Sequence, residues 1–551
     1  MNNSEIHFSQ IPDVLKQRSK FDRSKRVATT FSAGDLIPLY WDEVLPGDSI
    51  TMDFVHVTRM LTPIAPVMDS CWLDVFAFFV PDRLTWEHFK EFWGENKLTK
   101  WEQQVNYEIP QIKAPTGGFN VGSLADYLGF VPGIETERDA TPFRAYALIW
   151  NEWFRDENLK DPCYIPMGDA TVTGKNKDNN YDYVTDTALG AAPAKVSKAH
   201  DMFTSALPAP QKGPSVAIPL GQTAPVIFSE FTPDPNYPGF TNQAGLEGKE
   251  VAFILQTGKT AVDLRVNGDL GSTGQLNFDK GIALATDLNN AIGATVTQLR
   301  QAIAVQRFQE ALARGGSRYT EEVRSIWGVK SPDARQQRPE YLGGKRFQIN
   351  IDQVLQTSAT DAVSPQGNTA AYSVTVNKDN LFTYSASEHG KIFVLCAVRQ
   401  HHSYAQGFER KWSRKKRSDF YVPQYANLSE MPIYNDQLYA QGDNVVDSDG
   451  NVIDKQVFGY QEAWAEYRYS PSQVTGLMRP QVNGSLAIWN YADYYTSLPY
   501  LSSEWIDETD TNIARTLAVQ NQPQFKIDAY MPATWTRVMP MFSTPGLMDH
   551  H

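Results

Sequence analysis

The chain has 551 residues, of which 42% are hydrophobic and 12% aromatic, and its formal net charge is -13. This apolar content can bury a large core, which excludes global disorder, and the negative charge argues against indiscriminate nucleic-acid binding by the whole surface. The 33 prolines and 36 glycines are spread along the chain. That distribution favours turns and long loops, and so a mainly β fold, over a helical bundle.

The spacing of the cysteines and the length of the apolar runs indicate the cellular compartment in which the protein is made. Cys71, Cys163 and Cys396 lie far apart with no Cys-x-x-Cys spacing, so we expect no disulfide framework. The N-terminus has no basic stretch followed by an apolar core, and the most apolar runs are too short to cross a bilayer. We therefore expect a protein that is made in the cytoplasm and is not inserted into a membrane.

The chain opens with a polar, basic segment of weak periodicity, which we interpret as an arm over residues 1–35. Its candidate DNA-facing cations are Lys16, Arg18, Lys20, Arg23, Lys25 and Arg26. These cations suit contacts to phosphate, and the interleaved Phe21 could stack on a base. On composition alone, a solvated tail explains the segment equally well.

Strand patterns follow the arm. Ile50, Met52 and Phe54 alternate with other residues, and residues 71–80 are apolar on both faces, as in a strand covered on both sides. The late apolar runs 391–398 and 525–530 predict further strands. Antiparallel pairing of early with late strands predicts an eight-stranded antiparallel jelly roll, with long inserted loops and a few helices.

Two connections of this predicted body read as helices. Residues 84–95 predict a short one. Residues 141–159 predict a longer helix, because Pro142 suits the first turn and no breaker follows before Pro162. Its broad apolar face holds Phe143, Tyr146, Ala147, Trp150 and Phe154, whereas Arg144, Glu152 and Arg155 fall outside it. We interpret this segment as a helix that anchors the core.

The middle of the chain differs in composition from both ends. None of the 13 tryptophans lies between Trp153 and Trp327, and residues 165–293 are rich in Gly, Ala, Pro, Thr and Asn. We interpret 165–293 as a loop-rich insertion between two parts of the jelly-roll body, 36–164 and 294–551. A helix over 295–314 is expected to follow it, with an apolar face that contains Ala304, Val305, Phe308, Ala311 and Leu312.

A second basic segment lies in the later part of the body. Its candidate DNA-facing residues are Arg410, Lys411, Trp412, Arg414, Lys415, Lys416 and Arg417. Cations beside aromatic rings are typical of sequence-tolerant single-strand binding. Pairing with the acidic surface of a neighbouring subunit explains the same residues almost as well.

The motifs of common catalytic and metal sites do not occur. There is no phosphate-binding loop, no His-Glu-x-x-His pair and no Gly-x-Ser-x-Gly elbow. We therefore expect no catalytic residues, no metal and no cofactor. The C-terminal third is dense in Tyr and Trp, which suits packed interfaces but could also line a sugar-binding cleft with Asp507 and Glu508 as carboxylates.

Four stretches have residue orders that are too specific to be explained by the requirements of a fold alone. They read FSQIP over 8–12, RSKFDRS over 18–24, WDEVLPGD over 41–48, and PFRAY followed by IWNEWFRDENL over 142–159. With them the chain resembles the major capsid proteins of gokushoviruses, small icosahedral phages of the Microviridae. The similarity runs from about residue 8 to 159 and returns after residue 320.

The resemblance implies a coat protein that assembles into a T=1 icosahedral shell around a circular single-stranded DNA genome, found in the virion and, during assembly, in the host cytoplasm. It places the N-terminal arm on the inner shell surface and the insertion in a protrusion near the threefold axis, exposed for host attachment. The implied partners are other copies of the chain, the genome, a small basic DNA-binding protein, a pilot protein, a scaffolding protein and a host surface receptor.

Two other functions remain to be weighed. A β-rich carbohydrate-binding or carbohydrate-active protein would explain the aromatic density and the scattered carboxylates, and it would be a monomer or small oligomer with a concave aromatic site. A soluble single-strand DNA-binding protein fits less well with the net negative charge and the large aromatic core.

Overall fold

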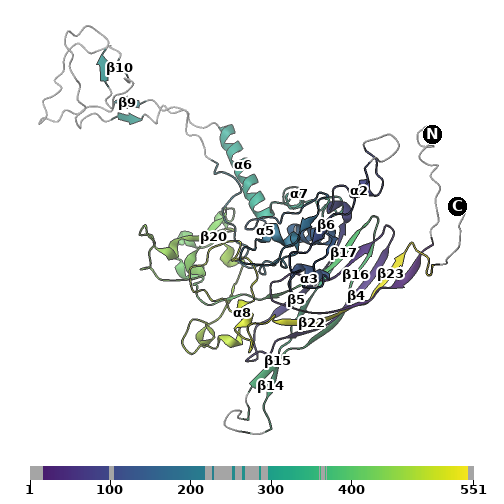
Figure 1. Ribbon diagram of the computed structural model, residues 1–551. Coiled ribbons are helices and arrows are strands. Elements are labelled where there is room, and N and C mark those ends of the chain that lie inside the picture. Colours follow the sequence, from purple (N-terminus) through teal and green to yellow (C-terminus); the bar gives the residue numbers. More distant parts are fainter. Residues whose placement is uncertain are drawn as a thin grey trace, which may run out of the picture. The chain divides into compact units, whose positions relative to one another are not determined.

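The computed structural model describes residues 17–97, 105–216, 226–228, 251–254, 263–266, 284–286, 296–358, 360, 366–367 and 369–543 (Figure 1). The chain divides into two compact units. The first contains Met1–Lys212 and Glu310–His551, and the second contains Gly213–Gln309. Among the described residues, no helix is both long and apolar enough to span a membrane.

One sheet of the first unit is four strands wide. Two of these strands are interrupted, so each is made of two shorter strands that follow each other in the chain. At the edge, β1 (Ser19–Asp22) and β2 (Lys25–Phe31) follow each other and pair with β23 (Ala533–Arg537) and β22 (Phe525–Met531). Both β22 and β23 pair with the long strand β4 (Ser49–Met60), which pairs on its other side with β16 (Thr375–Ser385).

The second sheet has four uninterrupted strands. Its order is β13 (Glu340–Gln348), β5 (Cys71–Pro81), β17 (Gly390–Gln400) and β3 (Ile37–Val44), and every neighbouring pair is antiparallel. If each interrupted strand counts once, the chain-order numbers of the strands are 1-8-3-6 in the first sheet and 5-4-7-2 in the second. This connectivity is that of an eight-stranded jelly roll, so the predicted fold class and the pairing of early with late strands are confirmed.

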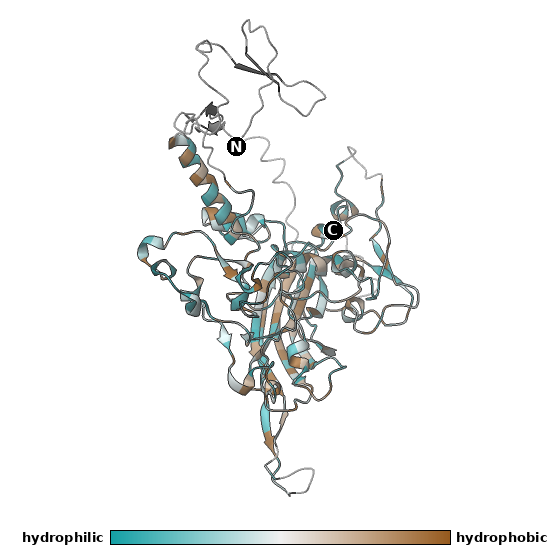
Figure 2. Ribbon diagram, turned by 90° about the vertical axis from the view of Figure 1, so that its left-hand side faces the viewer, coloured by the Kyte–Doolittle hydropathy of each residue, from teal (hydrophilic) through white to brown (hydrophobic). Residues whose placement is uncertain are grey.

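The core lies between the two sheets. From β4, Ile50, Met52 and Phe54 point inward, as the alternation predicts, and they meet Leu73 and Val75 from β5. Figure 2 shows apolar residues concentrated along the strands of this sandwich. The opposite face of β5 is also buried, because Phe78 and Val80 belong to a second apolar cluster. The prediction of a strand covered on both sides is therefore confirmed.

A helix covers that outer face. It consists of α4 (Thr141–Ile149), which continues as a π-helical turn over Trp150–Phe154. Phe154 meets Phe76 edge to face, with ring centroids 5.0 Å apart. The prediction that Arg144 lies outside the buried face is wrong. Arg144 is 1% exposed, and its two terminal nitrogens donate to the backbone carbonyls of Thr85 and Gly168 inside the protein.

The N-terminal segment is part of the sheet and not a separate arm over its described length. The jelly roll begins at Ser19, ahead of the predicted boundary at residue 36. Sequence periodicity missed β2 because polar and apolar residues do not alternate along it: its outward side has Arg26, Ala28 and Thr30, and polar Thr29 lies on the other side.

The insertion is narrower than predicted at its N-terminal side. Residues 165–212 belong to the first unit, where Ala188, Ala194 and Val196 are buried. The glycines of this stretch allow close packing: a Cβ at Gly174 would lie 2.4 Å from the Phe119 ring. A composition typical of linkers therefore belongs here to a packed layer.

The second unit is described only in short strands and part of one helix. The strands are β9 (Val226–Phe228), β10 (Val251–Ile254), β11 (Asp263–Val266) and β12 (Leu284–Thr286), and β9 pairs with β12 and β10 with β11. The predicted helix at 295–314 is confirmed as α6 (Val296–Gly315). Its expected apolar face is not buried, since Val305 and Phe308 are 41% and 49% exposed.

Short elements complete the first unit. Before the second unit they are α2 (Phe89–Phe92), β6 (Gln111–Lys113), α3 (Leu124–Leu128), β7 (Glu137–Asp139), β8 (Val172–Thr173) and α5 (Tyr183–Asp186), and after it come α7 (Tyr319–Trp327), β14 (Asp352–Leu355), β15 (Thr369–Tyr372), β18 (Ser403–Tyr404), β19 (Met431–Tyr434), β20 (Val457–Gln461), β21 (Ser472–Gln473) and α8 (Thr511–Ala514). The hairpin of β14 and β15 projects beyond the sandwich at the bottom of Figure 1. Most of the chain between β17 and β22 is irregular loop, and this region contains the second basic segment.

Candidate nucleic-acid interface

The first basic segment lies along the edge strand of the jelly roll. Arg23 falls between β1 and β2, and it reaches the carboxylate of Asp42 on β3 at 2.5 Å, which links the two sheets. Arg26 forms a two-pronged contact with Asp528 on β22, at 2.5 and 2.7 Å. These two guanidinium groups are therefore already matched with carboxylates of the body.

The other cations of this segment are less constrained. Lys25 lies over the ring of Tyr40, with its ammonium group 5.5 Å from the ring centroid. Arg18 and Lys20 are exposed, and no ion pair to either is found within the described part of the chain. Lys16 falls outside the described residues. Of the six predicted cations, Arg18 and Lys20 thus have the clearest access to an external phosphate.

In the second basic segment, two arginines point into the protein. Arg414 approaches Glu466 at 3.3 Å and lies 4.6 Å from the ring centroid of Tyr467. Arg410 donates to the carbonyl of Pro432 at 2.8 Å and is 4.0 Å from the same Glu466 carboxylate. Both side chains are largely buried, so they hold the loop in place.

The rest of the second segment points outward. Trp412 is 75% exposed. Lys415, Lys416 and Arg417 are also exposed, and no side-chain ion pair to them occurs among the described residues. Lys411 pairs locally with Glu409 at 2.6 Å. Asp419 accepts hydrogen bonds from the backbone N–H groups of Lys415 and Lys416, which fixes the turn that presents their side chains.

The two segments do not form one continuous site. Both belong to the first unit, but no hydrogen bond, ion pair or ring contact connects them in the described structure. Each offers cations to an anionic polymer, and the second adds an exposed aromatic ring. Such an arrangement can neutralise phosphate and stack on bases without reading sequence.

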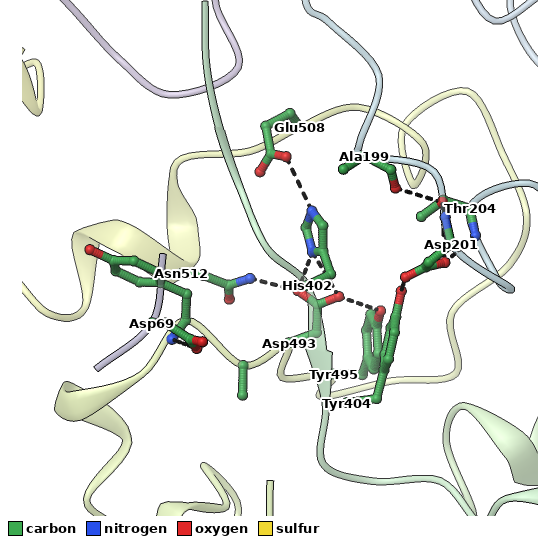
Figure 3. Close-up of polar contacts among 12 residues, drawn as sticks. Asp69, Ala199, Asp201, Thr204, His402, Tyr404, Asp493, Tyr495, Glu508 and Asn512 are labelled. Carbon is green, nitrogen blue, oxygen red and sulfur yellow. Dashed lines mark hydrogen bonds and ion pairs between the residues drawn. The ribbon is translucent and has the colours of Figure 1, made fainter. Parts of the chain in front are cut away.

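The carboxylates considered for a sugar site are otherwise engaged. Glu508 and Asp493 hold the imidazole of His402 between them, at 3.1 Å from Nε2 and 3.1 Å from Nδ1, as Figure 3 shows. Asp507 accepts from Lys160 at 2.6 Å. Because Glu508 is fully buried and Asp507 is paired with a buried lysine, neither is presented in a cleft as a free catalytic carboxylate.

The histidine in this cluster is held in its charged form. Burial by itself would lower the pKa of His402, but the negative charges of Asp493 and Glu508 outweigh burial and raise the pKa to about 10. Burial opposes ionisation of Asp493 as well, and the charged His402 overcomes it and lowers the pKa of that carboxyl. The cluster therefore joins the end of β17 to the C-terminal loops by ionic contacts inside the protein.

The aromatic residues of the C-terminal third are divided between core and surface. Tyr491 and Trp464 are buried, whereas Tyr467, Tyr469 and Tyr500 are 51%, 41% and 70% exposed. They do not converge on one cleft. Nor does any group of three or more His, Cys, Asp or Glu side chains in the described residues have the arrangement of a metal site.

The fold and the exposed cations narrow the class of protein. A jelly roll of two four-stranded sheets is an architecture of viral capsid proteins, lectin domains and cupins. Of these, a capsid protein that encloses nucleic acid is the one for which exposed cations and aromatic rings on loops and an edge strand are expected. The structure therefore points to a shell protein.

Comparisons with known proteins agree with this class. The model of the family "Capsid protein (F protein)" matches residues 9–547. Capsid protein VP1 of Spiroplasma virus 4 is 39% identical over 99% of this chain and 98% of its own length. VP1 of Chlamydia phage 1 is 37% identical over 98% of this chain and 97% of its own, and VP1 of Bdellovibrio phage phiMH2K is 39% identical over 99% and 98%. The chain belongs to the capsid protein family of Microviridae phages, as its resemblance to gokushoviruses indicates.

Sequence reasoning missed the residues that decide which cations are accessible. Asp42, Asp528 and Glu466 pair with arginines that lie 19, 502 and 52 residues away in the chain. Only the strand register and the folding of the loops bring these partners together, so no local pattern could have identified them.

Proposed function

We propose that this major capsid protein closes into a T=1 icosahedral shell around a circular single-stranded DNA genome, with structural and no catalytic duties. The observation that carries the proposal is the likeness to capsid proteins along nearly the whole chain. Assembly follows from many modest contacts repeated by symmetry, since a closed shell uses the same surfaces in every copy.

The basic segments would contact the genome from the inner shell surface. The support is that Arg18, Lys20, Lys415, Lys416 and Arg417 are exposed without carboxylate partners in the described structure. On a chain of net charge -13, such local clusters let the interior attract phosphate while the rest of the surface does not. A small basic DNA-binding protein and a pilot protein would share the interior, and a scaffolding protein would act during assembly.

The experiment that tests this function is expression of the chain together with its neighbouring phage genes, followed by sedimentation and electron microscopy. We expect small icosahedral particles that contain single-stranded DNA, and a reconstruction should place both basic segments on the inner surface. A subunit that stays monomeric with all its partner proteins present would contradict the proposal and would return attention to saccharide binding.

The inserted unit Gly213–Gln309 is proposed as the surface protrusion at the threefold axis, used for attachment to a host receptor. Its separation from the jelly-roll unit supports this role, because an independent excursion can vary without disturbing the shell. Replacement of residues 213–309 by a short Gly/Ser linker should leave shells intact but abolish adsorption to host cells. If the shortened chain no longer assembles while the full chain does, the unit is a part of the shell itself.

A further inference from the structure

A shallow hollow opens beside the second basic segment. Its volume is about 60 Å³. Phe203 and Tyr404 lie at its base, and Phe408 and Tyr469 form walls. The two base residues are buried, whereas Phe408 and Tyr469 are 58% and 41% exposed. Aromatic rings therefore form part of the lining, beside the charged side chains of Glu409, Arg410, Lys411 and Glu466. The exposed cations Lys415, Lys416 and Arg417 follow in the chain directly after Arg414, which contacts the lining residue Glu466.

The base of the hollow is rigid. The rings of Phe203 and Tyr404 meet edge to face with centroids 4.7 Å apart. The hydroxyl of Tyr404 donates to Asp201 at 2.5 Å, and the same carboxylate accepts from the backbone N–H groups of Phe203 and Thr204, both at 2.8 Å (Figure 3). Because these contacts fix both rings within the fold, little ordering would be needed on binding.

The wall at Phe408 is positioned by a close approach of two loops. The backbone N–H of Phe408 donates to the carbonyl of Asp436 at 2.8 Å. A Cβ on the preceding Gly407 would lie 1.9 Å from the carbonyl oxygen of Gln437, so only glycine fits there. The backbone at Phe408 is therefore held in place by these contacts, although the Phe408 ring itself is exposed.

The charges around the hollow are distributed in a way that suits a nucleotide. The acidic groups at its rim are already neutralised, Glu409 by Lys411 and Glu466 by Arg414. The exposed amide of Gln473 adds a neutral polar group. The unpaired cations, Lys415, Lys416 and Arg417, follow on the adjacent turn. The edge of a flat neutral base could therefore enter the hollow, with its phosphates toward the cations of the following turn.

We propose that this hollow takes a base of the packaged single-stranded DNA against the rings of Phe408 and Tyr469, with the cations of residues 415–417 on the flanking phosphates. The inference rests on the proposed function of the shell and adds a base-stacking site to its contacts with phosphate. An acidic surface of a neighbouring subunit would need the cations but would have no use for the aromatic hollow, which is why DNA is the favoured occupant.

The test compares a deoxythymidine oligonucleotide with an abasic strand of the same length and charge, each bound to the full-length protein. We expect the wild type to bind the base-containing strand about tenfold more tightly, since stacking of one base on aromatic side chains contributes a factor of roughly 5 to 150. The F408A/Y469A variant should lose this preference and W412A should keep it, because Trp412 is exposed but does not line the hollow. The exposed Tyr500 lies outside the hollow, so Y500A is the matched control and should keep it.

Variants of the cations separate this inference from the proposed function. The K415Q/K416Q/R417Q variant should weaken binding of both strands by similar factors. Equal affinity of the wild type for both strands would overturn the base site while leaving phosphate contacts in place. If the cation variant instead binds both strands as the wild type does but forms fewer shells, the segment is a subunit interface, and both the hollow and its proposed contact with the genome are wrong.

In DNA-filled particles, ultraviolet cross-linking with mass spectrometry gives an independent readout. We expect cross-linked nucleotides on the peptides that contain Phe408 and Tyr469. Particles that carry cross-links only elsewhere would overturn the base site, although the shell would still enclose DNA.

Discussion

The two basic segments contain six cations each, at residues 16–26 and 410–417, but the structure uses them differently. In the first segment, a strand edge directs Arg23 and Arg26 onto carboxylates of the body. In the second, a loop turns Arg410 and Arg414 inward and leaves the last three cations outside. The density of cations along a sequence is therefore a poor guide to the charge that a ligand meets. Carboxylates far away in the chain decide which cations remain available.

The largest effect on stability is expected for a cation that is completely enclosed by the protein. His402 is 3% exposed and lies between Asp493 and Glu508. Replacing it with alanine leaves two buried carboxylates without their counter-ion, so we expect the free energy of unfolding to fall by about 3–5 kcal/mol. The imidazole of the neighbouring His401 is exposed, with Ser472 as its hydrogen-bond partner and the Trp72 ring 6.1 Å away, and no carboxylate is paired with it in the described structure. H401A is therefore the matched control. Equal shifts in the urea midpoint for the two variants would contradict an ionic role for His402.

The same histidine predicts a pH dependence whose sign can be worked out. Its pKa is raised in the folded state to about 10, above the value of about 6.5 in an unfolded chain. Its stabilisation is therefore complete below about pH 6.5 and is lost as the pH rises toward 10, at up to about 1.4 kcal/mol per pH unit. The difference in unfolding free energy between wild type and H402Q should shrink from pH 7 to pH 9. A difference that stays constant would show that His402 is neutral.

An intermediate effect is expected within the second basic segment itself. The side chains of Arg414 and Glu466 are 14% and 9% exposed, so R414A should destabilise the subunit by about 2–3 kcal/mol. The exposed Lys416 is two residues away, and K416A should change stability by no more than about 0.5 kcal/mol. Chemical unfolding of the purified subunits measures both. If K416A proves as costly as R414A, the division into inward and outward cations is wrong.

Much of the jelly roll was predictable because its strands have a strong local pattern. The alternation at Ile50, Met52 and Phe54 and the doubly buried run of β5 both follow from burial by two sheets. The edge strand β2 was not recognised, because one of its faces meets solvent and carries cations typical of an exposed tail. Edge strands often have such residues, since charges discourage unwanted pairing with other chains.

The sequence predicted the residue types of the candidate site correctly, but it did not predict which side chains point inward and which point outward. Sequence indicated that cations and rings gather at 410–417, but not that Arg414 would be buried against Tyr467 and Glu466. The stretch after residue 165 shows the opposite error. Its small residues predicted an exposed excursion, whereas Gly174 and Gly190 lie close to the rings of Phe119 and Phe143 in a packed layer. Small residues occur both in close packing and in loops, and only the fold distinguishes the two.

The smallest effect on stability, and the clearest on binding, is expected when the outward cations are neutralised, and neutralising the same number of cations on the edge strand provides the comparison. Each cation that contacts a phosphate of single-stranded DNA adds about 0.7 to the slope of log affinity against log salt. K415Q/K416Q/R417Q should therefore reduce that slope by about 2 for an oligonucleotide. R23Q/K25Q/R26Q removes as many charges but from groups that already contact Asp42, Tyr40 and Asp528, so its slope should change by less than about 1. Similar slopes for both variants would mean that pairing in the free subunit does not govern which cations meet DNA, and that the edge strand rearranges when the genome binds.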